Sequence, residues 1–571
     1  MVHLSLKSRC LTLLLALGLS ACQRGHSEIT PPRPTPLPQE ELIQVYTNHE
    51  PASSYAEVDR QQTRSGDNLE QVIVDTIASA RSSVTVAVQE LRLPRIAAAL
   101  VERQKAGVKV RVILENTYSR AFSSFTQAEV EKLPERDRAR VQDSWRLIDQ
   151  NGDGQLDQAE ISTRDALMML DQGHVARLDD TADGSVGSSL MHHKFLLVDD
   201  RTVIVTSANF TSSDVHGDLK TPSSRGNANT LLKLSSPELA QIFTEEFNLM
   251  WGDGPGSKPD SKFGTRKPQR PVRSVTIGST KVEVKFSPAA KSVGWENSSN
   301  GLIGKTLDGA TQAIELALFV FSDQKLVNKL EPLHQNGVEI HALIEPEFAY
   351  RSYSEALDMM GITLTDDCKI EASNRSWQNP IATVGVPRMP PGDLLHHKFG
   401  IVDRKIVITG SHNWTDAANN GNDETVLVLH SPVIAAHYHR EFDRLYTDAI
   451  LGIPPAIQKK AAAQKQQCPQ IQARPPLPAP KPQPSDRPQS ASKPVQQVTP
   501  RRPEPDRPQE RVNLNTATQA DLETLPGVGA KLAQRIIAAR QQKPFTSLED
   551  LDRVPGMGAK LLDKLRDRVT W

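Results

Sequence analysis

Two long stretches of the chain repeat the same order of apolar and polar positions. In the first stretch, an apolar run at 83–88 precedes a helix-like pattern at 95–106 and a second apolar run at 108–114. The corresponding segments of the second stretch are 314–320, 325–336 and 338–344. In each stretch, the strand–helix–strand order predicts two parallel strands joined by a right-handed crossover.

Both stretches also end on a helix-like segment with the same aromatic spacing. Phe247 and Trp251 in the first segment match Phe442 and Tyr446 in the second, and a glutamate precedes each phenylalanine. An internal repeat of this size predicts an α/β fold. We expect two pseudo-symmetric α/β sandwich halves, with a functional site between them.

Each stretch contains one copy of a polar motif, H-x-K-x4-D followed by a Ser-x-Asn turn, and the copies lie 204 residues apart. The motif residues are His192, Lys194, Asp199 and Asn209 in the first copy and His396, Lys398, Asp403 and Asn413 in the second. Residues two apart in a strand share a face, so each histidine projects beside its lysine. Phosphodiester cleavage needs a nucleophile, a proton donor and cationic groups around the phosphoryl oxygens. Two facing copies would supply all of these groups.

This pair of motifs resembles the HKD motif that defines the phospholipase D superfamily, and the resemblance covers residues 65–450. It implies one histidine that forms a phosphohistidine, a second histidine that acts as general acid, and no catalytic metal. The family usually places the nucleophile in the N-terminal motif, which favours His192 as nucleophile and His396 as acid. Both motifs lie in one chain, so a monomer suffices for a complete site. Thr206 departs from the family pattern, which has glycine there.

The halves also differ at the acidic position that follows the turn. This position is Glu424 in the second half and Asn229 in the first. A carboxylate strengthens an imidazole as a base, whereas an amide only orients it. We therefore expect one catalytic histidine to contact a carboxylate and the other an amide. The sequence leaves open which histidine Glu424 contacts.

An insertion distinguishes the first half from the second. The interval between the crossover and the motif, Gly107 to His192, is 85 residues, whereas its counterpart has 59. The insertion contains a loop that matches the twelve-residue EF-hand calcium pattern, between helix-like segments at 138–148 and 162–170. The expected ligands are Asp149, Asn151, Asp153, Gln155, Asp157 and Glu160. A single loop predicts weak calcium binding with a structural or regulatory role. The alternative is an acidic loop that binds no ion.

The N-terminus has the pattern of an export signal. Lys7 and Arg9 precede an apolar run at 11–19, which is too short to span a membrane as a mature helix. The following Leu19-Ser20-Ala21-Cys22 resembles a bacterial lipobox, with Cys22 as the lipidated residue. We expect a membrane-anchored lipoprotein on the periplasmic or cell-surface side. An ordinary signal peptide with a chance cysteine is the alternative.

The C-terminal region changes composition twice. Residues 454–511 hold 15 prolines, with 11 Lys or Arg against 4 Asp or Glu, which predicts a basic, extended tether. Residues 512–571 contain two G-x-G turns that each precede a helix, and they resemble the helix-hairpin-helix DNA-binding domain of bacterial competence DNA receptors. Such turns present backbone N–H groups to phosphates. The expected DNA contacts are Gly527, Gly529, Lys531, Gly556, Gly558 and Lys560. A helical capping or protein-interaction module is the alternative.

These observations divide the chain into seven segments. They are a lipoprotein signal (1–22), a spacer (23–64), the first half (65–255, with the insertion at about 138–172), a linker (256–275), the second half (276–453), the tether (454–511) and a small all-α domain (512–571). Cys468 falls in the tether and only Cys368 remains besides Cys22, so we expect no disulfide framework.

The net charge of −1 leaves the partner open, and only the motifs indicate a function. We expect a non-specific DNA endonuclease that needs no catalytic cofactor and binds calcium away from the chemistry. The first alternative is a phospholipase D that acts on lipid headgroups, which the membrane anchor favours. The second is an inactive DNA-capture lipoprotein. The C-terminal domain discriminates between the enzymes, because lipid hydrolysis has no need of it.

Overall fold

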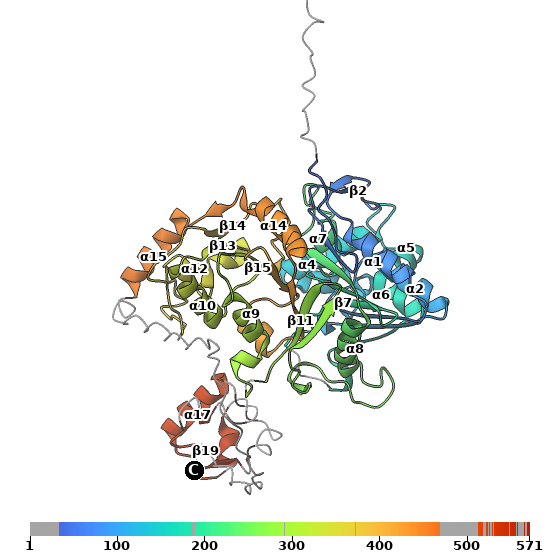
Figure 1. The fold of residues 1–571 in the computed structure, drawn as a ribbon. Helices are drawn as coiled ribbons and strands as arrows, with labels where there is room; N and C mark the ends of the chain where they lie inside the picture. Colours follow the sequence, from blue (N-terminus) through green and yellow to red (C-terminus); the bar gives the residue numbers. More distant parts are fainter. Residues whose placement is uncertain are drawn as a thin grey trace, which may run out of the picture. The chain divides into compact units, whose positions relative to one another are not determined.

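A computed structural model describes residues 33–184, 189–290, 292–371 and 373–468, together with parts of 512–571 (Figure 1). In the last region those parts are 512–517, 521–522, 525, 528, 530–547, 549–554, 557, 565 and 568–571. The chain forms two compact units, Met1–Lys481 and Pro482–Trp571. The predicted signal with its lipobox and the Pro-rich stretch at 469–511 lie outside the described residues.

The first half is built on a seven-stranded mixed sheet with the order β1-β9-β8-β7-β4-β5-β6. Its strands are β1 (Ile43–Thr47), β4 (Ser83–Val88), β5 (Lys109–Leu114), β6 (Ala176–Asp179), β7 (Lys194–Val198), β8 (Thr202–Thr206) and β9 (Thr230–Ser235), and β2 (Ser54–Ala56) and β3 (Thr63–Ser65) form a separate hairpin. β4 and β5 pair in parallel, as the sequence pattern predicts, and α2 (Pro94–Lys105) connects them. β4 also pairs antiparallel with β7, which brings the first motif to the middle of the sheet.

The second half repeats this arrangement in a nine-stranded sheet with the order β10-β11-β17-β16-β15-β12-β13-β14-β18. Its strands are β10 (Arg273–Ile277), β11 (Thr280–Ser287), β12 (Ala313–Leu318), β13 (Glu339–Ile344), β14 (Val384–Val386), β15 (Lys398–Val402), β16 (Ile406–Gly410), β17 (Glu424–His430) and β18 (Ile450–Leu451). β12 pairs in parallel with β13 and antiparallel with β15, so the second motif occupies the place of the first.

Helices cover the sheets, and two of them pack in a core that both halves share. The helices beside the first sheet are α1 (Leu69–Ala78), α2, α6 (Ala166–Gln172), α7 (Ser212–Val215) and α8 (Pro237–Trp251). Those beside the second are α9 (Ser299–Leu307), α10 (Gln324–Gln335), α11 (Pro346–Ala349), α12 (Glu355–Met359), α13 (Asp416–Asn420) and α14 (Pro432–Tyr446). α8 and α14 each begin with a serine cap followed by proline, a favoured start for a helix. Their apolar faces share one core with strands of both sheets. The predicted fold of two pseudo-symmetric α/β halves is confirmed.

The first half begins earlier than the sequence pattern predicts. The predicted spacer at 23–64 is wrong in its C-terminal part, because β1 forms the edge of the first sheet, antiparallel to β9. Ile43 and Val45 of this strand are buried in the core. The alternation covers only five residues after a Pro-rich run, so it becomes recognisable as a strand only when β9 offers an edge to pair with.

The second half, in turn, extends beyond residue 453. Helix α15 (Pro455–Gln467) packs on the core of this half through Ala461 and Ile457. Cys468 then forms a disulfide with Cys368, and their Cα atoms are 5.5 Å apart. The tether boundary at 454 and the expected lack of a disulfide are therefore wrong. The polar composition of α15 hides the few apolar positions that anchor it.

The insertion begins before the predicted residue 138, and it forms three helices and a loop. The helices are α3 (Gln127–Lys132), α4 (Glu135–Ile148) and α5 (Gln158–Arg164), and the EF-hand-like loop joins α4 to α5. The second loop helix begins before the predicted 162–170, because Asp157 and Glu160 form a reciprocal capping box at its start. Asp165 then caps α6, which splits the predicted helix in two.

The C-terminal unit has its own apolar core, which includes Leu514, Ile536 and Phe545. Its described elements are β19 (Val512–Asn513), α17 (Ala530–Gln542) and β20 (Val569–Thr570). Lys531 lies in α17, whereas the other five predicted DNA contacts fall outside the described residues. In the part of the chain that the structure describes, no helix is long and apolar enough to span a membrane.

Candidate active site

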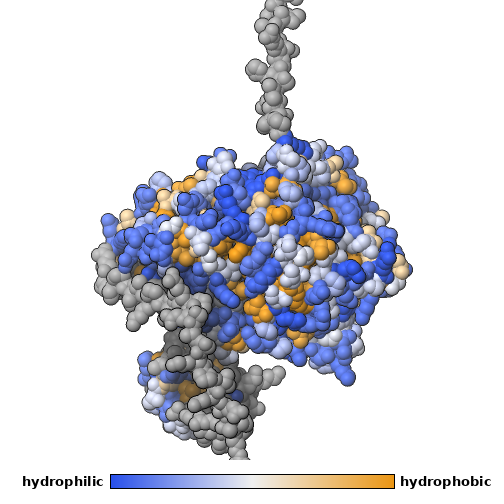
Figure 2. Space-filling view, viewed as in Figure 1, coloured by the Kyte–Doolittle hydropathy of each residue, from blue (hydrophilic) through white to orange (hydrophobic). Residues whose placement is uncertain are grey.

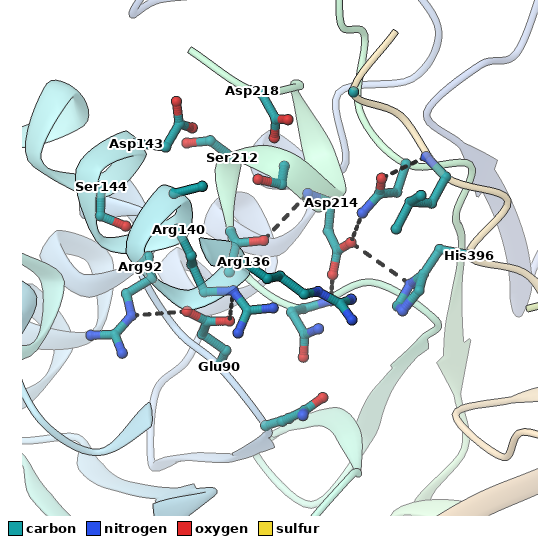
Figure 3. A pocket seen from close by; sticks show the side chains of 18 of the residues that line it. Glu90, Arg92, Arg136, Arg140, Asp143, Ser144, Ser212, Asp214, Asp218 and His396 are labelled. Carbon is teal, nitrogen blue, oxygen red and sulfur yellow. Dashed lines mark hydrogen bonds and ion pairs between the residues drawn. The ribbon is translucent and has the colours of Figure 1, made fainter. Parts of the chain in front are cut away.

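Both copies of the motif contribute residues to one cleft of about 660 Å³ in the first unit, and Figure 3 shows the part of this cleft that holds His396. His192 and His396 line this cleft together with the turn residues Asn209 and Asn413. Each histidine lies two residues before the start of a central strand, β7 or β15, whose first residue is the buried motif lysine. The fold therefore brings the two predicted sets of residues together.

Backbone pairing between the halves determines which turn meets which histidine. Met191 forms a parallel bridge with Asp423, and the N–H of His192 donates to the carbonyl of Asp423 at 3.0 Å. The pseudo-symmetric bridge joins Ala228 to Leu395. As a result, Glu424, which follows Asp423, lies against His192 of the first half. In the same way, Asn229, which follows Ala228, lies against His396 of the second half.

Glu424 contacts His192, which answers the question that the sequence leaves open. Its Oε2 lies 2.7 Å from His192 Nδ1 and accepts a hydrogen bond from Ser411 Oγ at 2.7 Å. A carboxylate acceptor at Nδ1 favours the tautomer with its proton on Nδ1 and a lone pair on Nε2. Burial raises the pKa of Glu424 and lowers the pKa of His192 well below its usual value.

Asn229 contacts His396. Its Oδ1 lies 3.0 Å from His396 Nδ1 and accepts from Ser207 Oγ at 2.8 Å. Its Nδ2 donates to backbone carbonyls, including that of Asp214 at 2.9 Å, which determines the orientation of the amide. The predicted asymmetry, a carboxylate behind one histidine and an amide behind the other, is therefore present in the structure.

A carboxylate that is not among the predicted site residues also lies near His396. Asp214 Oδ1 lies 3.7 Å from His396 Nδ1 (Figure 3). The side chain of Asp214 is held by the N–H of Asn209 at 2.7 Å and by Asn227 Nδ2 at 2.6 Å. Alignment of the two halves by their turns places Ala418 at the equivalent position, so this difference was visible in the sequence.

The motif lysines have different neighbours. Each Nζ donates to the carbonyl of its motif histidine, at 3.0 Å for Lys194 and 2.6 Å for Lys398. Lys194 also donates to Gln89 Oε1 at 3.2 Å, whereas Lys398 lies 4.9 Å from the centre of the Phe319 ring. Gln89 and Phe319 follow the equivalent strands β4 and β12. The pseudo-symmetric site therefore has a polar side and an aromatic side.

The buried charges suit the cleft to an anion. Burial lowers the pKa of Lys194 to about 8, and burial together with repulsion from Lys194 lowers that of Lys398 well below its usual value. Burial and the two lysines also lower the pKa of His192 and His396, so both imidazoles are neutral at pH 7. A phosphate group between the lysines would offset this accumulated positive charge.

The motif aspartates do not belong to the cleft. Asp199 and Asp403 adopt φ values of +53° and +51° in tight turns at the far ends of β7 and β15. Their carboxylates accept backbone N–H groups that precede or begin β4 and β12, such as that of Ser82 at 2.7 Å and that of Gln312 at 2.7 Å. The prediction that they are catalytic is wrong, because a five-residue strand separates each of them from the histidine end.

The second histidine of each motif has a structural position. His193 Nε2 lies 3.4 Å from Glu246, and His397 Nε2 lies 2.8 Å from Glu441. Both imidazoles are fully buried. These glutamates belong to α8 and α14 and precede the matched phenylalanines that end the two repeats in the sequence. The repeated glutamate therefore corresponds to a repeated contact with a buried histidine.

A buried charge cluster supports the segment that carries Glu424. Lys267 Nζ lies 2.6 Å from Asp423 Oδ1 and also pairs with Glu246, which Arg270 contacts at 2.9 Å. The side chains of Lys267, Glu246 and Asp423 are 0% exposed. Lys267 lies in the predicted linker 256–275, where no periodicity indicates burial. Only the tertiary structure identifies it.

The EF-hand-like loop carries oxygen groups of the kind that calcium prefers. Asp149 accepts N–H groups of Gly152 and Gly154 at 2.7 and 2.9 Å, and these glycines have φ values of +73° and +77°. The Glu160 carboxylate turns back onto the loop and accepts the N–H of Gln150 at 2.8 Å. Among the described residues, no group of three or more acidic, His or Cys side chains is arranged to hold a metal ion. The loop therefore fits calcium in its ligand types and backbone path, without an assembled set of carboxylates.

Two family models match the chain. Residues 73–251 and 303–446 match the family described as "Cardiolipin synthase, PLD-like domain", which is more than half of the chain. Residues 507–570 match "Helix-hairpin-helix motif".

Individual proteins match parts of the chain. Mouse mitochondrial cardiolipin hydrolase is 31% identical over 155 residues, which are 27% of this chain and 60% of that protein. Phospholipase D of Rickettsia felis is 25% identical over 159 residues, which are 28% of this chain and 66% of that protein. The chain therefore spans less than two thirds of these relatives. The crystal structure of Nuc, a phospholipase D family member from Salmonella typhimurium, matches 31% of this chain and 99% of its own, with 22% identity and a TM-score of 0.24.

Proposed function

Since the chain belongs to the phospholipase D superfamily of phosphodiesterases, we propose that it is an exported DNA endonuclease that acts through a phosphohistidine intermediate. The proposal assigns the nucleophile to His192 and the general acid to His396. Lys194, Lys398, Asn209 and Asn413 bind the phosphoryl oxygens, which are the places where negative charge develops.

In the first step, His192 Nε2 attacks the phosphorus atom and the bond to the leaving oxygen breaks. The leaving oxygen takes a proton from His396 Nε2. An anionic phosphate in the cleft and Asp214, 3.7 Å from Nδ1, favour the protonated form of His396. Glu424 stabilises the positive charge that His192 gains. Water then attacks the phosphohistidine, gives its proton to His396, and the nitrogen–phosphorus bond breaks.

The observation that carries a nucleic-acid substrate is the helix-hairpin-helix match at 507–570, in the same chain as the catalytic halves. Helix-hairpin-helix turns hold backbone phosphates with little regard to sequence. Most of the residues that line the cleft have polar or charged side chains (Figure 3). None of the large exposed apolar side chains of the described residues lines the cleft, and apolar groups are dispersed on the face in Figure 2. These features favour a polar strand over acyl chains.

A phospholipid substrate is the second candidate function. The relatives named cardiolipin hydrolase and phospholipase D favour it, and so does the lipobox-like Cys22. A third possibility, DNA capture without catalysis, conflicts with two sets of motif histidines, lysines and asparagines that meet at one site. Release of products from plasmid DNA and from cardiolipin vesicles by the full chain, each with EDTA, distinguishes the three candidates.

Removal of the C-terminal unit provides the sharper test of the substrate. The truncation should follow Lys481, because α15 and Cys468 belong to the second half. We expect the KM for duplex DNA to rise at least about tenfold with little change in kcat, because a tethered DNA-binding domain adds ground-state and transition-state binding alike. Hydrolysis of bis(4-nitrophenyl) phosphate should stay unchanged and serves as the control. An unchanged KM for DNA together with rapid cardiolipin cleavage would favour the lipid substrate.

We also propose that the loop Asp149–Glu160 binds calcium and affects stability more than chemistry. A ligand that binds only the folded chain raises its melting temperature through mass action. Calcium should raise the melting temperature of the wild type, and Glu160→Ala should remove most of this shift, because the glutamate supplies two ligand oxygens. Glu131→Ala, a change at an exposed glutamate of α3, is the matched control. A shift that persists in Glu160→Ala would assign the ion to another site.

The proposed location is the outer side of a membrane, with the chain held by a lipid on Cys22. The support is the apolar run at 11–19 followed by the lipobox-like sequence. Recovery of the mature protein without a fatty acid on Cys22 would contradict the anchor but not the catalytic proposal.

A further inference from the structure

The insertion reaches the catalytic cleft as well as the predicted calcium loop. One face of α4, with residues spaced three or four apart, lines the same cleft as His192 and His396. These residues include Arg136, Arg140 and Leu147. The second half has no counterpart of the insertion, so α4 makes the cleft asymmetric.

Most acidic groups on this side of the cleft are already paired. Glu90 contacts Arg92 at 3.2 Å and Arg140 at 3.8 Å. Asp143 accepts the backbone N–H groups of Leu219 and Lys220 at 3.1 and 2.9 Å, which ties the loop after α7 to α4. These contacts neutralise carboxylates that would otherwise repel an anionic substrate.

Arg140 is occupied in the same network. It donates to the hydroxyl of Tyr118 at 2.7 Å and lies 3.7 Å from Asp137. Its role is therefore to support the wall, and a substrate would have to displace these contacts to use it.

Arg136, in contrast, makes no hydrogen bond or ion pair with the residues that the structure describes. It is exposed, and its side chain extends from α4 toward the part of the cleft that holds Asp214 and His396 (Figure 3). Lys220 also lines the cleft and is exposed. Glu347 of α11 is an exposed carboxylate in the lining from the second half. The exposed positive charges of the lining therefore lie on the first-half side.

We propose that Arg136 and Lys220 bind phosphates of a nucleic-acid strand next to the phosphodiester that is cleaved, so that the insertion selects substrates with neighbouring phosphates. This inference rests on the proposed phosphodiesterase function. Arg136 can bind a phosphate through two parallel N–H donors, and Lys220 can do so as a point charge. The strand follows the α4 wall and avoids Glu347.

The test compares two oligonucleotides of one sequence. In the first, all linkages are phosphodiesters. In the second, a single phosphodiester is flanked by uncharged methylphosphonate linkages. Arg136→Gln should lower kcat/KM for the first about tenfold, as the loss of one charge-assisted contact implies, and should leave the second within about twofold. Lys220→Gln should act in the same direction. The salt dependence of log kcat/KM should decrease by about 0.7 for each lost single-strand contact.

Lys132→Gln is the control, because this exposed lysine of α3 carries the same charge but does not line the cleft. Arg136→Lys should retain most of the salt dependence, which separates a charge effect from a folding defect. Equal loss on both oligonucleotides, or no loss on either, overturns the inference. If the wild type cleaves neither oligonucleotide nor bis(4-nitrophenyl) phosphate, the proposed function itself is wrong and the inference falls with it. Dependence on Arg136 for cardiolipin alone would assign these side chains to a lipid headgroup.

Discussion

His192→Ala and His396→Ala should each lower kcat for phosphodiester cleavage by at least about a thousandfold, because residues that act as one catalytic unit cannot replace each other. His192 loses the attacking Nε2, and His396 loses the proton that the leaving oxygen needs. The substrate for this measurement is a dinucleoside monophosphate, whose alkoxide leaving group needs that proton and which is too short to require the C-terminal unit. Activity of the wild type should persist in EDTA, since lysine and asparagine side chains bind the phosphoryl oxygens.

His412→Ala is the matched control for the loss of a buried imidazole. His412 is the buried middle residue of the second Ser-x-Asn turn, makes no hydrogen bond through either ring nitrogen within the described residues, and has Ala208 as its counterpart. We expect this variant to retain activity. Denaturation in alkaline detergent during turnover should trap a phosphoryl group on His192, because a nitrogen–phosphorus bond survives base but not acid. A group trapped on His396 would exchange the two roles, whereas loss of activity in EDTA with an intact fold would contradict the metal-free mechanism.

Lys267→Met should destabilise the first unit by about 3–5 kcal/mol, because it leaves a buried carboxylate without its partner. Lys267 lies 2.6 Å from Asp423 and also contacts Glu246, and all three side chains are fully buried. Urea unfolding of the full chain provides the measurement. Activity should fall as well, since Asp423 immediately precedes Glu424 and its displacement would alter the contact with His192.

Lys281→Met is the control for this experiment. Lys281 is half-exposed and pairs at 3.1 Å with Glu283, which His430 also contacts at 2.9 Å, so the loss of Lys281 should cost at most about 1 kcal/mol. The double variant Lys267→Met/Asp423→Leu should recover part of the lost stability, because an apolar pair can replace a buried ion pair. Equal stability of Lys267→Met and Lys281→Met would show that the cluster does not support the fold.

The same cluster implies a pH dependence of stability. Burial by itself would raise the pKa of Glu246, but Lys267, Arg270 and His193 lower it below its usual value. A carboxyl whose pKa is lower in the folded chain stabilises the fold above its unfolded pKa and loses that contribution as the pH falls toward the folded value. The cluster should therefore weaken only under acid conditions.

The fold could be predicted from the sequence where its pattern is local. The strand–helix–strand order at 83–114 and 314–344 specifies the central sheet of each half, because alternation and helical periodicity are properties of consecutive residues. The local pattern does not predict β1 or α15. Each has few apolar positions, and a neighbouring sheet edge or core face decides their structure.

The site divides in the same way. The motif predicts which chemical groups meet, because His192, Lys194 and Asn209 recur in the second half and complete one site with those copies. It also misassigned Asp199 and Asp403, because membership of a motif does not specify which end of a strand a residue occupies. The tight turns and their N–H groups explain why aspartate stands there.

By itself, the sequence determined the two repeated halves, the paired histidines and lysines, and the difference between Glu424 and Asn229. Only the tertiary structure decided that Glu424 faces His192, that Lys267 supports it from an irregular segment, and that α4 brings Arg136 to the cleft. The physical reason is distance along the chain. Residue types and short-range periodicity are properties of neighbouring positions in the chain. The partner of a buried group depends instead on how segments of different halves pair, as in the bridge that joins Met191 to Asp423.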